Sequence, residues 1–247
     1  MLEKAATLPA DEVVVDLEDG VAVAEKEAAR ANLATVRARR TLAVRINGLR
    51  TPWWRDDLAA AQADVIVLPK VESADEVAAV AELLPRAVGL EAQIETALGL
   101  VEVERIAAIG APLEALVFGP GDFAASLGAP VLTIGSGASE YAMVRIAVAA
   151  RAFGLQVIDG PYAVLADVEE LRRSAERARR LGYDGKWAIH PNQLPTINDV
   201  FTPSAHELER ARALLAAADG ATALGGEMVD AATKRLAEAV LARASGP

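Results

Sequence analysis

The sequence contains no cysteine and only two histidines among its 247 residues. The absence of cysteine excludes disulfides, thiolate metal sites and a cysteine nucleophile, and it fits a reducing compartment. Two histidines are too few for a histidine-based zinc site. We therefore expect a cytoplasmic protein whose chemistry depends on neither thiols nor a zinc centre.

Long apolar runs, aromatic residues and positive charge are also scarce. No run approaches the roughly 18–20 apolar residues of a membrane span, and the first residues do not resemble a signal peptide. The net charge of −10 makes nucleic acid and anionic membranes poor partners. Only 4% of the residues are aromatic, so we expect an aliphatic core, which suits parallel strands packed against helices.

What the sequence does contain is a regular alternation of strand-like and helix-like segments. Short apolar runs predict seven strands, at residues 13–16, 42–46, 65–68, 88–94, 116–118, 156–158 and 186–189. Helical patterns lie between them, and this period favours a TIM-type (β/α)8 barrel over a doubly wound sheet. The eighth strand is expected before Met1, because residues 2–8 already read as a first helix.

The C-terminal part of the sequence has a different pattern. We expect the barrel to occupy residues 1–202 and a helical extension to occupy residues 203–247. Two alanine-rich helices are predicted there, at 205–218 and 228–244, joined by residues 220–226 with no strand between them. Such an extension could cover a site or a neighbouring subunit.

The candidate site lies where the predicted strands end. Residues 113–128 read as a strand followed by a glycine turn that delivers Asp122, and Glu95 directly follows the strand at 88–94. The carboxyl ends of parallel strands are where ligands bind in such folds. Two carboxylates with water are ligands that Mg²⁺ prefers, so Glu95 and Asp122 are the metal candidates. Either acid could instead cap the following helix, although Thr96 is better placed than Glu95 to do so.

Other strand-end residues carry a functional and a structural interpretation. Glu18 and Asp19 could form only a charged turn, but in a mouth that already holds two acids we favour a role around metal-bound water. Arg45 could be a structural ion-pair partner or a fork for a substrate carboxylate. His190, which precedes Pro191, could simply stack in the barrel.

Residues 119–124 also match the dinucleotide fingerprint G-x-G-x-x-A, after a strand and before a helix. The match is weak for physical reasons, because Asp122 would place negative charge against a pyrophosphate and Pro120 lacks a backbone donor. A nucleotide-cofactor oxidoreductase is nevertheless an alternative, as is a non-catalytic barrel that serves as an assembly partner.

Eight motifs together resemble the citrate lyase beta-subunit-like proteins of the HpcH/HpaI aldolase superfamily, whose relatives include malyl-CoA and citramalyl-CoA lyases. In chain order they are DLEDGV (16–21), VRIN (44–47), VLPKVES (67–73), IETA (94–97), FGPGD (118–122), GKWAIHP (185–191), FTPS (201–204) and MVD (228–230). One departure is the absence of the arginine-bearing first strand with which family members usually begin. The resemblance implies a Mg²⁺-dependent carbon–carbon lyase, or a thioesterase, that acts on a short 3-hydroxyacyl-CoA.

The resemblance also implies a role for each matching residue. Glu95 and Asp122 would bind Mg²⁺, while Glu18 and Asp19 would hold metal-bound waters. Arg45 would polarise the carbonyl of the keto-acid unit, with help from backbone N–H groups near Gly121 and Asp122, and His190 and Pro191 would contribute to substrate binding. Asp230 would come from a neighbouring subunit of a homo-oligomer, a trimer or a hexamer, and act near the thioester; alternatively it only caps its own helix. The bound cation would stabilise an alkoxide or activate a carbonyl.

Overall fold

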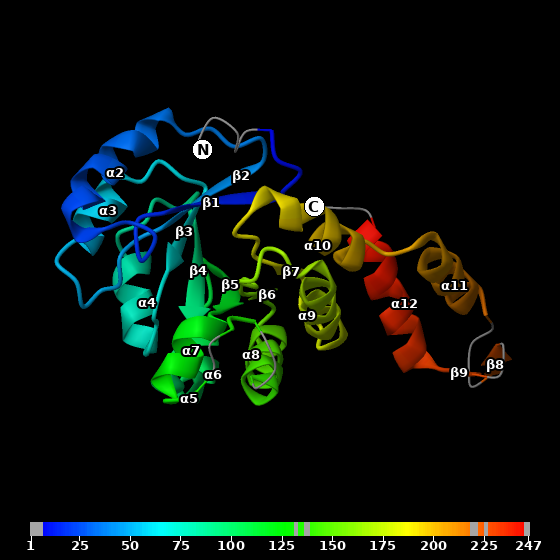
Figure 1. Cartoon of the computed structure of the whole chain (residues 1–247). Coiled ribbons are helices and arrows are strands. Elements are labelled where there is room, and N and C mark those ends of the chain that lie inside the picture. Colours follow the sequence, from blue (N-terminus) through cyan, green and yellow to red (C-terminus); the bar gives the residue numbers. More distant parts are fainter. Residues whose placement is uncertain (1–6, 131–132, 136–138, 218–221, 225–226, 245–247) are drawn as a thin grey trace. The chain divides into compact units, whose positions relative to one another are not determined.

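Seven parallel strands form one sheet, and the strands follow one another in chain order. The computed structural model describes residues 7–130, 133–135, 139–217, 222–224, 227–244. Each strand of the sheet pairs with the next, so that within the described residues β1 and β7 are its two edges (Figure 1). The strands are β1 (Glu12–Asp16), β2 (Thr41–Arg45), β3 (Val65–Leu68), β4 (Gly89–Ile94), β5 (Leu113–Phe118), β6 (Gln156–Asp159) and β7 (Gly185–Lys186).

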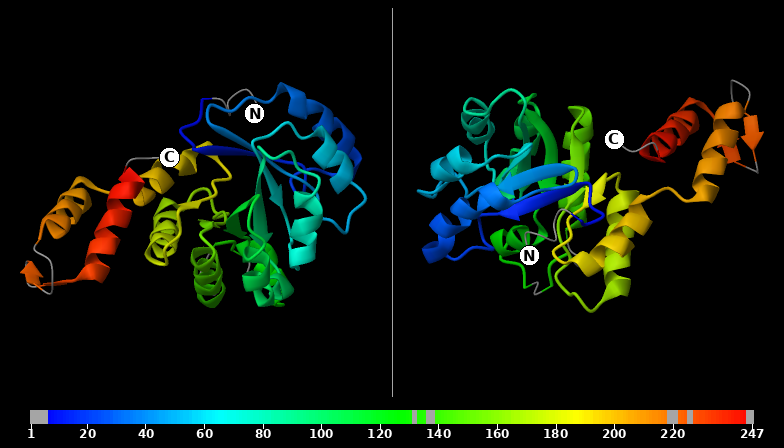
Figure 2. Two further views of the ribbon diagram at one scale, coloured as in Figure 1. Left: turned by 180° about the vertical axis from the view of Figure 1, so that it is seen from behind. Right: turned by 90° about the horizontal axis from the view of Figure 1, so that it is seen from above.

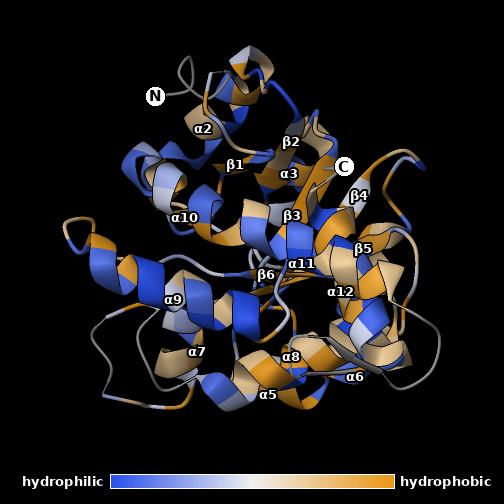
Figure 3. Ribbon diagram, turned by 90° about the vertical axis from the view of Figure 1, so that its right-hand side faces the viewer, coloured by the Kyte–Doolittle hydropathy of each residue, from blue (hydrophilic) through white to orange (hydrophobic). Residues whose placement is uncertain are grey.

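The strand sequences explain why the sheet is buried. β3 has the sequence VIVL and is buried at all four positions, as expected for a parallel strand with both faces covered. β1 lies at the edge and is partly exposed along its whole length. Figure 3 shows the same contrast, because the central strands are coloured as hydrophobic whereas α9 (Val168–Arg180) is largely hydrophilic.

Helices follow most of the strands and lie outside the curled sheet (Figure 2). α4 (Ala74–Ala81) begins after Ser73, whose side chain accepts a hydrogen bond from the backbone N–H of Glu76. α9 begins after Asp167, whose side chain accepts a hydrogen bond from the backbone N–H of Glu170. None of the described helices is both long and apolar enough to cross a bilayer. The remaining helices of this unit are η1 (Val23–Glu25), α2 (Lys26–Asn32), η2 (Leu33–Thr35), α3 (Trp54–Ala60), α5 (Ala97–Val101), α6 (Val103–Ala107), α7 (Pro120–Ser126), α8 (Glu140–Ala152) and η3 (Pro191–Gln193).

The chain divides into two compact units, residues 1–197 and residues 198–247, and α10 (Leu194–Phe201) spans the division. The second unit contains α11 (Ala205–Ala216), α12 (Ala231–Ala244) and an antiparallel pair of strands, β8 (Thr222–Leu224) and β9 (Glu227–Val229). α11 begins with a capping box, in which Ser204 and Glu207 satisfy each other's backbone N–H groups.

Two sequence-based expectations for the second unit were wrong. A strand pair is present where none was expected, and the last helix begins at Ala231 rather than at Met228. Each strand has only three residues, which is too short to show a period, so the pattern at Met228 and Val229 merges with that of the following helix. The expected helix at 2–8 and the strand expected before it fall largely or wholly outside the described residues, so that strand stays a prediction.

Candidate active site

The carboxyl ends of β4 and β5 place Glu95 and Asp122 beside each other in the first unit. Ile94 and Phe118 are register partners, so the residues that follow them leave the sheet side by side. The chain continues from Phe118 through Gly119 into α7, whose first turn carries Asp122. The sheet topology thus brings together two acids that are 27 positions apart in sequence.

Glu95 is buried, with 1% of its surface exposed, and its carboxylate accepts a hydrogen bond of 2.9 Å from the backbone N–H of Lys70. Burial, and after it the negative charge of Asp122, raise the pKa of Glu95 to about 8. Gly119 makes room for this carboxylate, because a Cβ there would lie 2.2 Å from Glu95 Oε2. A bound cation would offset the repulsion between these two acids and stabilise the ionised form of Glu95.

A strand-end lysine to which the sequence analysis gave no chemical role connects these acids. The Nζ atom of Lys70 forms ion pairs with Glu18 and with Asp19 Oδ2, the latter at 2.8 Å, and lies 3.8 Å from Asp122 Oδ2. Burial opposes the charge of Lys70, but its hydrogen bonds to Asp19 and Glu18 outweigh burial, so the pKa of Lys70 is raised. We call the four acids that Lys70 contacts, Glu18, Asp19, Glu95 and Asp122, the carboxyl-end cluster.

Arg45, at the end of β2, is held by Asp16 at the end of β1. Its Nε and Nη2 atoms donate to the two oxygens of Asp16 at 2.9 and 2.7 Å. Burial opposes ionisation of both partners, but this bidentate pair outweighs it, so the pKa of Asp16 is lowered and that of Arg45 is raised. Its Nη1 atom lies 3.3 Å from Glu18 Oε2 and 3.4 Å from Gln93 Oε1, and the guanidinium lies over the ring of Trp187. The Nε and Nη2 atoms of Arg45 thus form a structural ion pair, whereas its Nη1 atom is the candidate for a functional contact.

The other candidates of the first unit lie in different settings. Gly121 is in the first turn of α7, where backbone N–H groups have no acceptor within the helix. His190 and Pro191 are exposed at the start of η3, where His190 Nδ1 accepts a hydrogen bond of 3.2 Å from the backbone of Asn192. Within the described residues, no hydrogen bond or ion pair joins His190 or Pro191 to Glu95 or Asp122.

Asp230 belongs to the second unit and caps α12. Its Oδ1 atom accepts hydrogen bonds of 2.9 Å from the backbone N–H groups of Ala232 and Thr233, and its own N–H donates to the Thr233 hydroxyl at 2.7 Å. The hydrogen bonds from Thr233 lower its pKa, so Asp230 is an ionised cap.

The donor set fits a hard cation that keeps part of its water shell. No group of three acidic or histidine side chains among the described residues is arranged to hold an ion by itself. Glu95 and Asp122 offer two carboxylates and no nitrogen or sulfur donor, which suits Mg²⁺ with water or substrate oxygens completing its coordination.

The nucleotide alternative finds little support in the geometry. The seven strands run in sequential order, so the sheet lacks the reversal at which doubly wound folds bind dinucleotides. Gly119 opens space for Glu95 rather than for a phosphate, since a side chain there would collide with that carboxylate.

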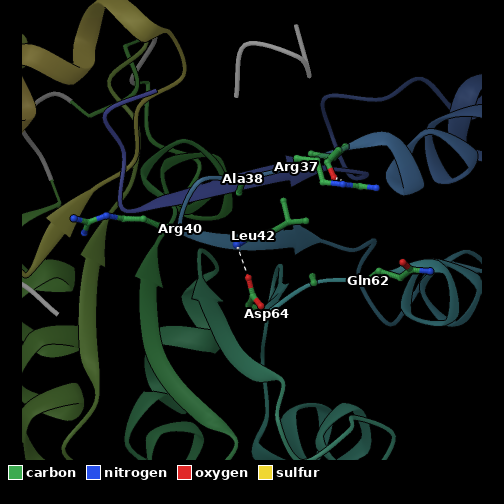
Figure 4. Close-up of a pocket in the computed structure, with 8 residues that line it drawn as sticks. Arg37, Ala38, Arg40, Leu42, Gln62 and Asp64 are labelled. Carbon is green, nitrogen blue, oxygen red and sulfur yellow. Dashed lines mark hydrogen bonds between the residues drawn. The ribbon is translucent and has the colours of Figure 1, made fainter. Parts of the chain in front are cut away.

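A hollow of about 410 Å³ lies at the opposite ends of the strands, where β2 and β3 begin (Figure 4). Its charged groups already have partners: Arg40 pairs with Asp11 at 2.6 Å, and Asp64 accepts a hydrogen bond of 2.9 Å from the backbone of Leu42. The hollow brings together no pair of acids, and the carboxyl-end cluster is the better candidate for chemistry.

Comparisons with known proteins agree with this arrangement. The family described as HpcH/HpaI aldolase/citrate lyase matches residues 1–191. The chain is 38% identical to an L-malyl-CoA/beta-methylmalyl-CoA lyase of Cereibacter sphaeroides, over 99% of this chain and 90% of that protein. It is 42% identical to a (3S)-malyl-CoA thioesterase of the same species, over 87% and 78%. The solved structure of CitE from Mycobacterium tuberculosis, in complex with magnesium, acetoacetate and coenzyme A, superposes with a TM-score of 0.84 at 36% identity, covering 96% of this chain and 90% of that one.

Proposed function

Since the chain belongs to the HpcH/HpaI aldolase/citrate lyase family, we propose that it is a Mg²⁺-dependent carbon–carbon lyase that acts on a short 3-hydroxyacyl-CoA such as malyl-, methylmalyl- or citramalyl-CoA. The observation that carries the proposal is the buried Glu95 beside Asp122, at the carboxyl ends of adjacent strands in a chain that is similar over 99% of its length to a malyl-CoA lyase. The family and the site thus point to the same chemistry.

In this proposal Glu95 and Asp122 hold the cation, and Glu18 and Asp19 orient water bound to it. When bound, Mg²⁺ supplies a Lewis acid that stabilises negative charge on a substrate oxygen. Asp16 fixes Arg45 through its Nε and Nη2 atoms. The Nη1 atom, which lies 3.3 Å from Glu18 Oε2 and 3.4 Å from Gln93 Oε1, is the nitrogen that would meet the keto-acid unit. The first-turn N–H groups of Gly121 and Asp122 bind the same unit, and His190 with Pro191 contributes to the rim that holds substrate.

The test is a panel of the three thioesters incubated with the protein and Mg²⁺. A lyase breaks the bond between the α and β carbons of the acyl group and yields a keto acid or aldehyde acid with a shorter acyl-CoA, without free thiol. A lyase is supported by carbonyl product in one-to-one ratio with acyl-CoA. Turnover of none of the three thioesters by folded, Mg²⁺-loaded protein would contradict it.

Thioester hydrolysis is the second candidate, favoured by the 42% identity to a malyl-CoA thioesterase. Hydrolysis consumes water and releases a free thiol with the hydroxy acid, so the same panel separates the two reactions. Thiol release without carbonyl product would assign the thioesterase activity.

We also propose that the seven strands are part of a TIM-type (β/α)8 barrel that extends over residues 1–202, with residues 203–247 as its extension. The extension would make the protein a homo-oligomer, a trimer or a dimer of trimers. The exposure of Leu236 on α12 supports a partner surface there, and Asp230 would act in the site of an adjacent subunit.

Subunit mixing tests the role of Asp230. Asp230→Ala and Arg45→Ala subunits are each expected to be inactive, and mixed oligomers should regain part of the activity because some sites then contain both residues. No recovery despite demonstrated subunit exchange, or an active monomer, would overturn the proposal.

A further inference from the structure

Lys70 has an unusual backbone conformation. Its φ is +53°, and it is the one residue other than glycine with a positive φ in the described parts of the chain. The left-handed region is unfavourable for a residue with a Cβ atom, and such strain persists where surrounding contacts determine the conformation. Lys70 follows Pro69 at the end of β3, next to the carboxyl-end cluster.

This conformation lets one residue contact the whole cluster. The backbone N–H points to Glu95 Oε1 at 2.9 Å, while the side chain turns towards the remaining three acids. The ammonium pairs with Glu18 and Asp19 and lies 3.8 Å from Asp122. An extended backbone would not offer the same combination of contacts, so the contacts account for the strain.

Two cations, Arg45 and Lys70, lie beside the four carboxylates of the carboxyl-end cluster. Arg45, the other cation beside the cluster, uses two of its nitrogens on Asp16 and approaches Glu18 with the third. Of the described cations, Lys70 is therefore the one that faces Asp19 and Asp122, and its side chain is 35% exposed at the mouth of the site. A divalent ion bound by Glu95 and Asp122 would meet this ammonium.

We propose that Lys70 is a positioning residue that holds the carboxyl-end cluster together in the metal-free protein and competes with Mg²⁺ for it. The inference rests on the proposed function, because it concerns the same carboxylates. Through its N–H group Lys70 keeps Glu95 oriented, and through its ammonium it lowers the affinity of the site for a cation. The four carboxylates thereby stay close together without Mg²⁺, and Mg²⁺ can still displace the ammonium.

The experiment removes the ammonium and measures metal binding directly. Lys70→Met keeps the length of the side chain, and Lys70→Asn adopts the left-handed conformation more readily; both keep the N–H group. Arg105→Met is the matched control, because Arg105, on α6, forms a surface ion pair with Glu102, the residue before that helix, and the substitution removes one positive charge there. Binding of MnCl₂ and MgCl₂ is measured by titration calorimetry and by electron paramagnetic resonance, and thermal unfolding is recorded in EDTA.

Both Lys70 variants should bind the metals about three- to tenfold more tightly, since a partly exposed ammonium has a modest effect on its neighbours. Their midpoint of unfolding in EDTA should fall, and Arg105→Met should change neither quantity. Wild-type binding with unchanged or weaker binding in the Lys70 variants would overturn the inference alone. No binding by the wild-type protein would overturn the proposed metal site, and the inference with it. Each variant lacks the ammonium, so either one decides the question if the other does not fold.

Discussion

Acidic side chains gather at both ends of the parallel strands, and the two groups differ in what compensates their charge. The carboxyl-end cluster contacts an ammonium, a guanidinium and backbone donors. At the other ends of the strands, carboxylates with raised pKa values lie close enough to influence one another. We call this second group, which consists of Glu12, Glu91 and Glu114, the amino-end cluster.

Among the described residues, the amino-end cluster has no comparable compensation. Burial, followed by the charge of Glu114, raises the pKa of Glu12 to about 7. Burial and the neighbouring acids raise that of Glu91 well above its usual range, and Glu91 Oε2 is buried without a hydrogen-bond partner in the described structure. Charge organised by cations can serve a ligand, whereas charge without them lowers stability.

The largest effect should come from removing a carboxylate of the carboxyl-end cluster. Glu95→Gln and Asp122→Asn should each lower Mg²⁺-dependent turnover more than about 100-fold, beyond the loss expected for a residue that only supports a metal ligand. Circular dichroism should show an intact fold. Glu91→Gln makes the same chemical change at the other end of the strands and should retain activity; equal losses in all three variants would erase the distinction between the clusters.

A smaller loss is expected when the bidentate cation is replaced. Arg45→Lys should lower kcat/KM roughly 100-fold or less, because a point charge cannot keep both Asp16 contacts and also direct a donor at substrate. Steady-state kinetics measure this loss. Arg151→Lys is the control, because Arg151 forms an ion pair of 2.6 Å with Asp184 and does not belong to the site. Unchanged turnover in Arg45→Lys would make Arg45 a purely structural partner.

Gly119→Ala should disturb the cluster through packing. The added Cβ would lie 2.2 Å from Glu95 Oε2, so the carboxylate or the start of α7 must shift, at a cost of about 1–3 kcal/mol of unfolding free energy. Metal affinity should fall as well. At Gly48 the nearest atom to an added Cβ is 3.9 Å away, so Gly48→Ala is the control in denaturant titrations. Wild-type stability and metal binding in Gly119→Ala would show that the close approach has no importance.

The smallest effect concerns the amino-end cluster and pH. A carboxyl group whose pKa is higher in the folded than in the unfolded state binds more protons when folded, so stability falls as the pH rises. For Glu12 this loss extends from its usual value of 4.5 to about 7. Glu91→Gln should raise the midpoint of unfolding at pH 8 by a few degrees and have a smaller effect at pH 5.

The wild-type minus variant difference isolates the cluster, because the contribution of Glu95 is common to both proteins. A variant that is equally stable or less stable at pH 8 would contradict the view that this cluster is uncompensated. Asp16 has a lowered pKa and the opposite sign: its stabilising effect is present above its usual value and is lost in acid.

Most strands and helices of the first unit could be predicted because their signals are local. The strand expected at 186–189 was largely wrong, because β7 comprises only Gly185–Lys186. The apolar run at 65–68 is bounded by Asp64 and Pro69, and Ser73 is a residue type that commonly caps the start of a helix. The hairpin at 222–229 was missed because three-residue strands are too short to show a period. The parallel sheet follows from the alternation of elements and is also supported by the structural similarity to CitE.

The site was predictable in its acids and less so in its contacts. Glu95 and Asp122 stand at strand ends, which sequence patterns reveal. The contacts of Lys70 with Glu18 and of Arg45 with Asp16 join residues 52 and 29 positions apart, and neither spacing carries a periodic signal. The left-handed conformation of Lys70 is likewise fixed by tertiary contacts rather than by its local sequence.

The central claim is that a divalent cation binds at the carboxyl-end cluster and not at the amino-end cluster. Anomalous diffraction from a crystal grown with MnCl₂ and pyruvate tests it most directly. We predict one strong peak with oxygen atoms of Glu95 and Asp122 at about 2.1 Å, a distance typical of a small hard cation. A peak at Glu12, Glu91 and Glu114, or no peak near Glu95 at saturating metal, would contradict it.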